Sequence, residues 1–315
     1  MAEIRKQKTK TNYILQRIIP YIGFIILVVL FATLTDFKSV SINNIGLIVR
    51  QSYVLLISAT GVFFIMTMGG LDFSQGSIIG VASIFVASFA NVNLGLAVFL
   101  GVVSGVLIGF INGFIHVKFK VASFIATICT MYIFRGLCAF LTTDKPVSAP
   151  LFMIYLNQWY ILMPITLAVL IVGWYGFTYT AFGKILKAIG AGEKAARFSG
   201  INVGKTKLIV FTISGALTGL AAFINTIRVG SITASAGSLV ETNIMIALVL
   251  GGMPVSGGAR NKFSSVIVGV LLLGVLNNGL VMVQIGPTIQ QLIRGFVFLI
   301  IVAVTNDRKS NMIVK

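Results

Sequence analysis

The chain has very few charged residues, and acidic residues are the scarcest of them. Of its 315 residues, 24 are Lys or Arg and only 7 are Asp or Glu, so charged residues make up 10% of the sequence, against roughly 25% in a soluble domain. Hydrophobic residues make up 57%, and the mean hydropathy is +1.02. These values exclude an ordinary cytosolic enzyme, a disordered chain and a nucleic-acid-binding domain, in spite of the net charge of +17.

Residues suited to catalysis and metal binding are also scarce. The one histidine, His116, leaves at most one imidazole for a catalytic triad or a metal cluster. Cys129 and Cys138 lie in an apolar stretch, where thiols are more often packing residues than a disulfide or a metal pair. No GxxxxGK[ST] motif occurs, which excludes ATP hydrolysis by that route. The sequence therefore predicts neither an enzyme nor a metal or cofactor site in this chain.

Long apolar segments are what the sequence has in abundance. A membrane helix needs about 20 mostly apolar residues, and we count ten candidates: 15–34, 45–67, 75–90, 94–115, 121–141, 159–180, 207–227, 242–257, 263–283 and 288–304. The third and eighth are short, as re-entrant or broken helices are. The sequence predicts an all-α polytopic membrane protein with one transmembrane domain over 1–315, including a basic segment 1–14, an inner loop 181–206 and a tail 305–315.

The basic residues predict how the chain is oriented. If the N-terminus is inside, the inner segments carry eighteen Lys or Arg, the outer segments carry three and the spans carry the remaining three. Because cytoplasmic loops are enriched in Lys and Arg, this distribution predicts cytoplasmic termini and an even number of spans. It also accounts for the net charge without an acidic partner. No small-residue cleavage site follows the basic N-terminus, so the first span is predicted to be retained.

Glycine-rich segments mark three features. The pattern Gly69-Gly70-x3-Ser74-x-Gly76 recurs at Gly251-Gly252-x3-Ser256-x-Gly258, which indicates weakly repeated halves of the kind found in transporters. The glycines at 101, 105, 109 and 113 form a stripe that lets another helix approach, for static packing or for a moving interface. Asp72 lies in the first of these segments with Gln75 three residues on, which predicts a helix N-cap with a capping-box partner; a role in transport is the alternative.

Polar residues within or near the spans are candidates for a solute path. Arg135 fits such a path, or a side chain that extends to the outer surface. Asn112, Asn277 and Asn278 could bind a neutral, hydroxyl-rich solute without the cost of desolvating a charge, or could bond to other helices. No Asp or Glu falls in the middle of a predicted span. This argues against an ion-coupled carrier, which usually needs one.

The inner loop from Gly190 to Asn202 carries apolar residues in basic surroundings. Residues 193–199 are predicted to form a short helix, with Gly200 as its C-terminal cap. Phe198 and Ile201 are its exposed apolar residues, with Arg197 beside them. Two interpretations fit: the loop docks into a groove of a cytosolic partner, or it lies on the surface of an anionic membrane.

Six segments in this order resemble the permease subunits of ribose- and autoinducer-2-type sugar ABC importers. They are residues 69–74, 122–136, 195–203, 250–258, 274–280 and 306–309. The resemblance implies a bacterial import system in the cell membrane. Two permease subunits, two copies of this chain or a pair of related permeases, would form the pore. A cytosolic ATPase would bind ATP and Mg²⁺, and an extracytoplasmic binding protein would deliver the solute.

The resemblance also implies roles for residues. Ala195, Ala196 and Gly200 match the coupling motif Glu-Ala-Ala-x3-Gly of importer permeases, although Lys194 stands at the glutamate position and Glu193 one residue earlier. Ser123 stands where such permeases often have proline. The predicted ATPase-coupling loop comprises Gly190, Glu193, Ala195, Ala196, Arg197, Phe198, Gly200 and Ile201. The predicted path comprises Asn112, Arg135, Asn243, Asn277 and Asn278, and the structural turn comprises Gly69, Gly70, Asp72 and Ser74.

The solute stays open among a sugar, a nucleoside and a related small polar molecule. Asn243, where the family often has aspartate, and Met253-Pro254-Val255 depart from the usual pattern near the predicted path. A ribose assignment is not supported by the residues alone. The alternatives to an ATP-driven importer are an ion-coupled secondary transporter and a membrane-embedded binding or structural subunit without transport.

Overall fold

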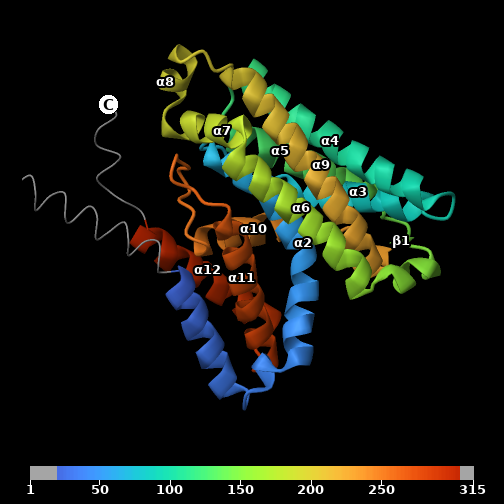
Figure 1. Ribbon diagram of the computed structural model, residues 1–315. Coiled ribbons are helices and arrows are strands. Elements are labelled where there is room, and N and C mark those ends of the chain that lie inside the picture. The colour runs from blue at the N-terminus through green and yellow to red at the C-terminus, as the bar shows by residue number, and fades with distance from the viewer. Residues whose placement is uncertain (1–19, 306–315) are drawn as a thin grey trace, which may run out of the picture. The chain divides into compact units, whose positions relative to one another are not determined.

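A computed structural model describes residues 20–305, which are almost entirely helical (Figure 1). The basic segment 1–14, the start of the first predicted span and the family-like residues 306–309 lie outside the described residues. The chain forms two compact units, which are described separately.

The larger unit comprises residues 53–245 and 256–263. Two short antiparallel strands, β1 (Val147–Ser148) and β2 (Ser231–Ile232), pair in the loops that follow its helices α5 and α9, and a 3-10 helix, η2 (Leu151–Leu156), follows β1. Its helices are most of α2 (Ile42–Thr67), α3 (Gln75–Phe89), α4 (Leu94–Lys118), α5 (Ser123–Leu141), α6 (Trp159–Tyr179), α7 (Ala181–Ala191), α8 (Glu193–Phe198), α9 (Val203–Val229) and the first half of α10 (Val240–Leu250).

Within the described residues, the smaller unit comprises 20–52, 246–255 and 264–305. It contains the helix Pro20–Leu34, the 3-10 helix η1 (Lys38–Val40), the start of α2, the end of α10, α11 (Ser264–Met282) and α12 (Pro287–Thr305). Glycines on α11 let neighbouring helices approach. A Cβ at Gly274 would lie 3.1 Å from Ile48 and 3.2 Å from Ser52, and one at Gly279 would meet the ring of Phe31.

Each of the ten predicted spans contains a helix. Six of these helices are long and apolar enough to cross a membrane, namely α2, α4, α5, α6, α9 and α11, and the other four are shorter apolar helices. The chain is therefore an all-α polytopic membrane protein, as its composition predicts.

Three details of the predicted spans were wrong. The span 242–257 ends as a helix at Leu250, because Gly251 and Gly252 turn the chain there. The span 207–227 begins four residues early, because the Asn202 side chain accepts a hydrogen bond from the Lys205 amide and caps α9. Helix α7 occupies the first part of the segment that was predicted to be a loop.

The two halves of the glycine repeat end their helices in the same way. Gly69 has φ 81° and the Gly70 amide donates to the carbonyl five residues earlier; Gly252 has φ 87° and the Met253 amide does the same. This is the Schellman arrangement, in which glycine takes the left-handed position. The shared motif is one residue out of register with the match read from the sequence.

Helices α4 and α9 run side by side along much of the larger unit (Figure 1). A Cβ on Gly105 would fall on the carbonyl of Gly215, and one on Gly109 would fall on the carbonyl of Phe211. The predicted close approach at the α4 stripe is therefore confirmed. Its partner also uses glycine at the contact, at positions 215 and 219.

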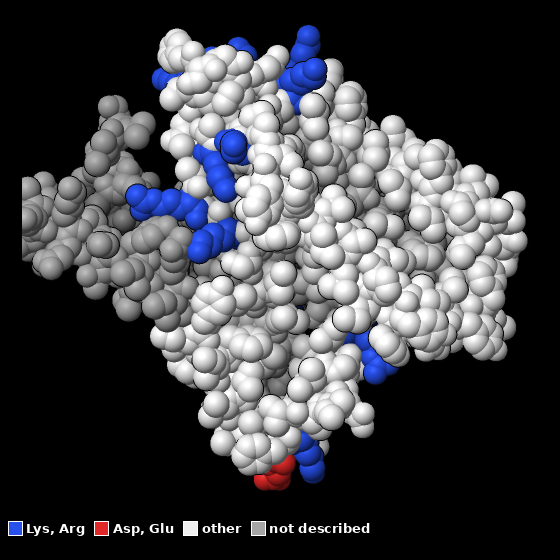
Figure 2. Space-filling model, in the orientation of Figure 1, with Lys and Arg blue, Asp and Glu red and all other residues white. Residues whose placement is uncertain are grey.

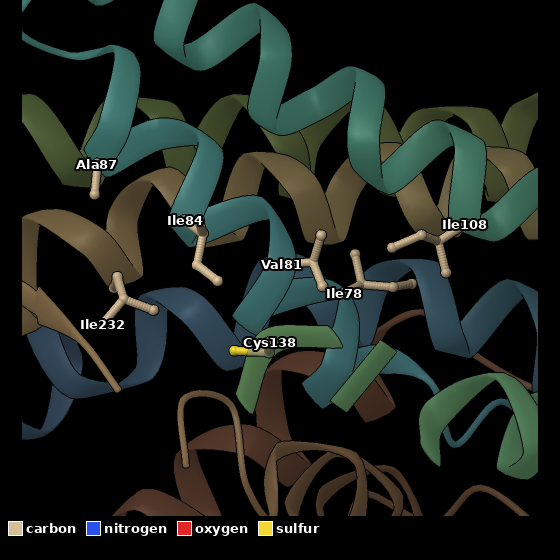
Figure 3. Packing of buried hydrophobic residues seen from close by; sticks show 7 residues of the cluster. All are labelled: Ile78, Val81, Ile84, Ala87, Ile108, Cys138 and Ile232. Carbon is tan, nitrogen blue, oxygen red and sulfur yellow. The ribbon is translucent and has the colours of Figure 1, made fainter. Parts of the chain in front are cut away.

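Helix α3 lies at the centre of the larger unit and is buried on nearly every face. Its apolar residues form a core with single residues from α4, α5 and β2, and the free thiol of Cys138 packs in this core as predicted (Figure 3). The cluster consists of Ile78, Val81, Ile84, Ala87, Ile108, Cys138 and Ile232. The N-terminus of α3 consequently brings its polar residues deep into the unit.

Candidate functional site

The short helix α8 is anchored through Glu193. Its Oε2 accepts a hydrogen bond from Lys207 Nζ of α9 at 2.7 Å, and its Oε1 accepts one from Arg197 Nη2 at 2.8 Å. The Lys207 side chain is 16% exposed and that of Arg197 is 64% exposed, so the bond to Lys207 is less screened by water and is the stronger anchor. This hydrogen bond from Lys207 holds the pKa of Glu193 below its ordinary value.

Gly200 ends α8 in the conformation predicted for a cap. Its φ is 81°, and the Ile201 amide donates to the Ala196 carbonyl at 3.1 Å. A side chain at this position would be strained, because left-handed backbone strongly favours glycine. Ala196 is buried, so the helix rests on one face. Gly190 also fixes the loop, since a Cβ there would fall on the Thr67 carbonyl at the end of α2.

The tip of α8 presents a large apolar side chain to its surroundings. Phe198 is 93% exposed, and Arg197 and Ser199 beside it are exposed as well. Basic side chains gather over the end of the larger unit that carries α7 and α8 (Figure 2). The surface thus combines an apolar projection with a basic rim. Ile201, predicted to share the projection, is half-buried.

The turn between α2 and α3 is held by hydroxyl groups of α5. The Leu71 amide donates to Ser123 Oγ at 3.0 Å, and the Phe73 amide donates to Thr127 Oγ1 at 3.1 Å. Proline, which the resemblance to sugar importer permeases leads us to expect at position 123, has no hydroxyl to accept the first bond. The departure at Ser123 therefore has a structural role in this chain.

The N-cap predicted at Asp72 was wrong, because α3 begins at Gln75 with Ser74 as its cap. Asp72 Oδ1 accepts from the Ser74 amide at 2.9 Å and from Ser74 Oγ at 2.6 Å, and its Oδ2 accepts from Gln75 Nε2 at 2.6 Å. Asp72 is buried, so its carboxyl group draws donors from both neighbouring side chains. Gln75 therefore binds the carboxylate rather than a backbone amide.

A polar network extends from this turn into the helices. Gln75 bonds to Ser214 at 3.2 Å and to Thr218, both on α9. Asn112 of α4, which is fully buried, donates to Ser74 Oγ at 2.7 Å and accepts from Thr130 Oγ1 of α5 at 2.6 Å. The network joins α3, α4, α5 and α9, and both ends of the Asn112 amide are used within it.

A cavity of about 270 Å³ separates this turn from α8. It is lined by the glycine turn, the ends of α4 and α5, and the anchor of α8, including Gly69, Gly70, His116, Ser123, Glu193 and Lys207. His116 Nδ1 lies 2.6 Å from the Val121 carbonyl. The anchor of α8 and the turn that starts α3 therefore face the same small space.

Arg135 forms an ion pair that joins α5 to α10. Its Nη2 lies 3.0 Å from Glu241 Oε1, and the two side chains are 29% and 6% exposed. Arg135 Nε and Glu241 Oε2 are buried without a hydrogen-bond partner among the described residues. Gly76 gives the pair its room, because a Cβ there would fall on the Glu241 carboxylate.

Sequence reasoning missed Glu241 as a buried acid. It stands one residue before the predicted span 242–257, whereas the structure places it in the first turn of α10. Glu241 lies at the end of its helix, so it does not contradict the statement that no Asp or Glu falls in the middle of a predicted span. Arg135 could have indicated a buried acid, because an arginine in an apolar helix is usually paired with one.

The remaining predicted path residues lie on α10 and α11. Asn278 exchanges two hydrogen bonds with Asn44, at 2.8 and 3.0 Å, in the smaller unit. Asn277 Oδ1, on the same helix, is buried and has no partner among the described residues. Asn243 is half-buried on α10. Within residues 20–305, no three His, Cys, Asp or Glu side chains are grouped so that they could hold a metal ion.

Comparison with known proteins identifies the family. The family model described as "Branched-chain amino acid transport system / permease component" matches residues 44–302. The ribose import permease RbsC of Bacillus subtilis is 35% identical over 308 residues, covering 95% of this chain and 94% of the relative. RbsC of Escherichia coli K12 is 32% identical over 91% of this chain and 93% of its own length.

A third relative transports a different sugar. The L-arabinose transport system permease AraH of Escherichia coli K12 is 33% identical over 91% of this chain and 87% of the relative. No solved structure matches the chain. The family model and the relatives agree with the resemblance to sugar importer permeases that the six sequence segments indicated. The chain therefore belongs to the permease-component family of branched-chain amino acid transport systems, and within it to the permeases of ribose-type sugar ABC importers.

Proposed function

We propose that this chain forms the translocation path of an ATP-driven, binding-protein-dependent sugar importer in the bacterial cytoplasmic membrane. Its relatives carry the names of ribose and L-arabinose permeases, so a pentose or a similar small polyhydroxylated solute is the substrate class. The observation that carries the proposal is Phe198, which is 93% exposed at the tip of an anchored, glycine-capped helix.

The proposed assembly follows from the family. Two permease subunits form the pore, and an extracytoplasmic binding protein delivers the solute. A cytosolic ATPase binds ATP and Mg²⁺, and this chain binds neither. All ten helices cross or enter the membrane with both termini inside. The collection of basic side chains at the α7–α8 end supports this orientation.

Helix α8 is proposed to be the joint between the ATPase and the pore. Burial of an exposed phenylalanine in a partner's groove contributes about 1.5–3 kcal/mol, and the basic rim at Arg197 adds charge complementarity to an acidic partner surface. Force on α8 passes to α9 through the bond between Glu193 and Lys207. Helix α9 in turn contacts the start of α3 through Ser214, Thr218 and Gln75.

The ion pair between Arg135 and Glu241 is proposed to contact the solute. A sugar hydroxyl both donates and accepts hydrogen bonds. Arg135 Nε–H and Glu241 Oε2 are buried without a partner among the described residues, so a movement that opens the path at this pair would expose one donor and one acceptor. Asn277 and Asn243 are further candidates, whereas the closed bonding of Asn112 and Asn278 favours the helix-to-helix role left open by the sequence.

A charge at the tip of α8 tests this function. Phe198→Asp should lower co-purification of the ATPase subunit at least tenfold, because the apolar contact is replaced by a hydrated charge. Ser199→Asp is the matched control, since it adds the same charge one residue away and keeps the phenylalanine. Gly200→Val should also weaken association by straining the cap.

Two outcomes would contradict the proposal. Normal ATPase association in Phe198→Asp, with normal membrane insertion, would remove α8 from the coupling role. If the Phe198→Asp variant lowers binding of α8 to anionic lipid and leaves ATPase association unchanged, the membrane-surface interpretation is supported instead. A nucleoside that competes with every sugar tested would shift the substrate class within the same family.

A further inference from the structure

A groove on the larger unit is lined almost wholly by hydrocarbon. It has a volume of about 400 Å³ and lies between α2, α6, α7 and α9. Its walls include Phe64, Val169, Val172, Phe182 and Leu217. Thr60, its one hydroxyl-bearing residue, already donates its proton to the Leu56 carbonyl. The groove therefore offers no hydrogen-bonding group to an occupant, and only an apolar chain suits it.

Glycines on α6 give the groove its depth. Gly176 has no atom within 4 Å of the position a Cβ would take, and Gly173 lines the same wall. From Ala168 to Gly176 the helix rises by about 12 Å, which is most of the hydrocarbon thickness of one leaflet, about 15 Å. The groove thus has the length of a lipid tail that lies along the protein.

Basic residues stand at one end of the groove. Phe182, at the start of α7, closes that end, and Lys184 and Lys187 follow on the same helix. Lys184 is exposed, and neither lysine forms an ion pair with an acid among residues 20–305. Lys187 Nζ lies 4.4 Å from the centre of the Phe177 ring, beside the groove wall at Gly176. Lys184 therefore stands exposed at this end without an acidic partner among the described residues, and Lys187 lies half-buried near it.

Helix α7 is placed as an interfacial helix should be. Its buried side carries Gly183, Leu186 and Ile189; Lys184 is exposed, and Lys187 is half-buried with its Nζ over the Phe177 ring. Trp174, Tyr175 and Tyr179 at the end of α6 are exposed, and such aromatic side chains collect at membrane–water interfaces. The polar end of a phospholipid would meet the lysines at this level.

We propose that this groove binds one acyl chain of an anionic phospholipid whose phosphate headgroup lies on Lys184 and Lys187. Each lysine near the surface should favour an anionic over a neutral lipid about fivefold. The bound lipid would brace α6 and α7 against α2 and α9, directly before the loop that carries α8. The transporter would then depend on anionic lipid at this site without any contact between lipid and solute.

Lipid retention by the full-length chain tests the proposal. The purified protein is incubated in detergent with equal amounts of phosphatidylglycerol and phosphatidylcholine that carry the same acyl chains. Bound lipid is then counted by native mass spectrometry. We expect one retained lipid per chain, with phosphatidylglycerol preferred at least tenfold. Lys184→Gln with Lys187→Gln should keep a retained lipid and lose the preference.

Filling the groove separates this site from general lipid contact. Gly176→Leu should abolish retention, since its side chain enters the open space without a clash. Gly295→Leu on α12, where a Cβ also meets nothing within 4 Å, is the matched control and should retain lipid. Ala168→Phe fills the other end of the groove, and it replaces Gly176→Leu as the test variant if Gly176→Leu does not fold.

Three results would overturn the proposal. One is equal retention of the two lipids by the unmodified protein. Another is unchanged phosphatidylglycerol retention in both Gly176→Leu and Ala168→Phe. The third is efficient disulfide formation between two copies of a Val172→Cys variant in phosphatidylglycerol nanodiscs. That result would show that a second chain, and not a lipid, covers the exposed Val172.

Discussion

Single residues set the charge balance of α8, the proposed coupling helix. Glu193 is the acid that holds α8 to α9, although the family motif has glutamate one residue later, where this chain has Lys194. The structure gives the shifted acid a defined partner in Lys207. The shift therefore changes which residue anchors the helix and leaves an anchor in place.

The lowered pKa of Glu193 predicts a pH response. A carboxylate with a depressed folded pKa stabilises the fold above its unfolded pKa, and this contribution is lost as the pH falls through the folded pKa. Protection of the α8 amides against hydrogen exchange, corrected for intrinsic rates, should therefore stay constant from neutral pH down to the ordinary pKa range of glutamate and should fall at lower pH. Glu193→Gln should raise the hydrogen-exchange rate of the α8 amides roughly two- to fivefold at neutral pH, as expected for loss of the partly exposed ion pair with Lys207.

Lys207→Gln provides the counterpart. Without the Lys207 hydrogen bond, the pKa of Glu193 should return toward its ordinary value, so the α8 amides should be less protected at neutral pH and should lose less protection as the pH falls. A pH profile that is identical in both proteins would show that Lys207 does not hold the carboxylate.

Helices pair in this protein through glycine as much as through large apolar side chains. The seam between α4 and α9 brings backbone against backbone at Gly105 and Gly215. In lipid there is no hydrophobic drive to join two apolar helices, so close packing has to supply the attraction. The seam is therefore a main stabilising feature of the larger unit.

Gly105→Ala should lower the thermal unfolding midpoint in detergent. Its Cβ would fall on a backbone carbonyl that cannot move without moving the helix, and such overpacking costs about 1–3 kcal/mol. Gly136→Ala on α5 is the control, because nothing lies within 4 Å of its Cβ position, and its midpoint should stay or rise. Equal midpoints for the two variants would argue against a tight seam.

Local signals in the sequence predicted the elements that depend on local chemistry. The helix predicted over 193–199, observed over Glu193–Phe198, and its cap at Gly200 followed from a short motif and one glycine. The end of α10 was predicted too late because Met253 is apolar and buried although it lies beyond the helix. A hydropathy pattern indicates which residues are buried and does not show where a helix ends. Helix α7 was missed because its lysines and glycines resemble a loop.

Partners distant in sequence could not be predicted. The α4 stripe indicated a close neighbour, but nothing local identified α9 as that neighbour. Arg135 and Glu241 are 106 residues apart, and only the fold brings them together. The hydroxyl of Ser123 looked like a departure from the family until the structure showed Leu71 bound to it.

At the scale of the whole molecule, the proposed orientation has a direct test. Lys145 follows α5 and Lys194 lies on α8, and both are exposed. In a background without Cys129 and Cys138, a membrane-impermeant maleimide should label Lys145→Cys on intact cells. It should label Lys194→Cys only after permeabilisation. Labelling of both positions from the same side would contradict the proposed arrangement of ten membrane helices.

The account as a whole proposes import driven by ATP through α8. The most direct measurement is uptake of labelled ribose by proteoliposomes that contain this chain, with the partner ATPase and binding protein added or omitted. We predict uptake that requires ATP and both partners, that an ion gradient cannot replace, and that Phe198→Asp reduces at least tenfold while Ser199→Asp does not. Uptake driven by an ion gradient without the ATPase, or full ATP-dependent uptake in Phe198→Asp, would contradict the account.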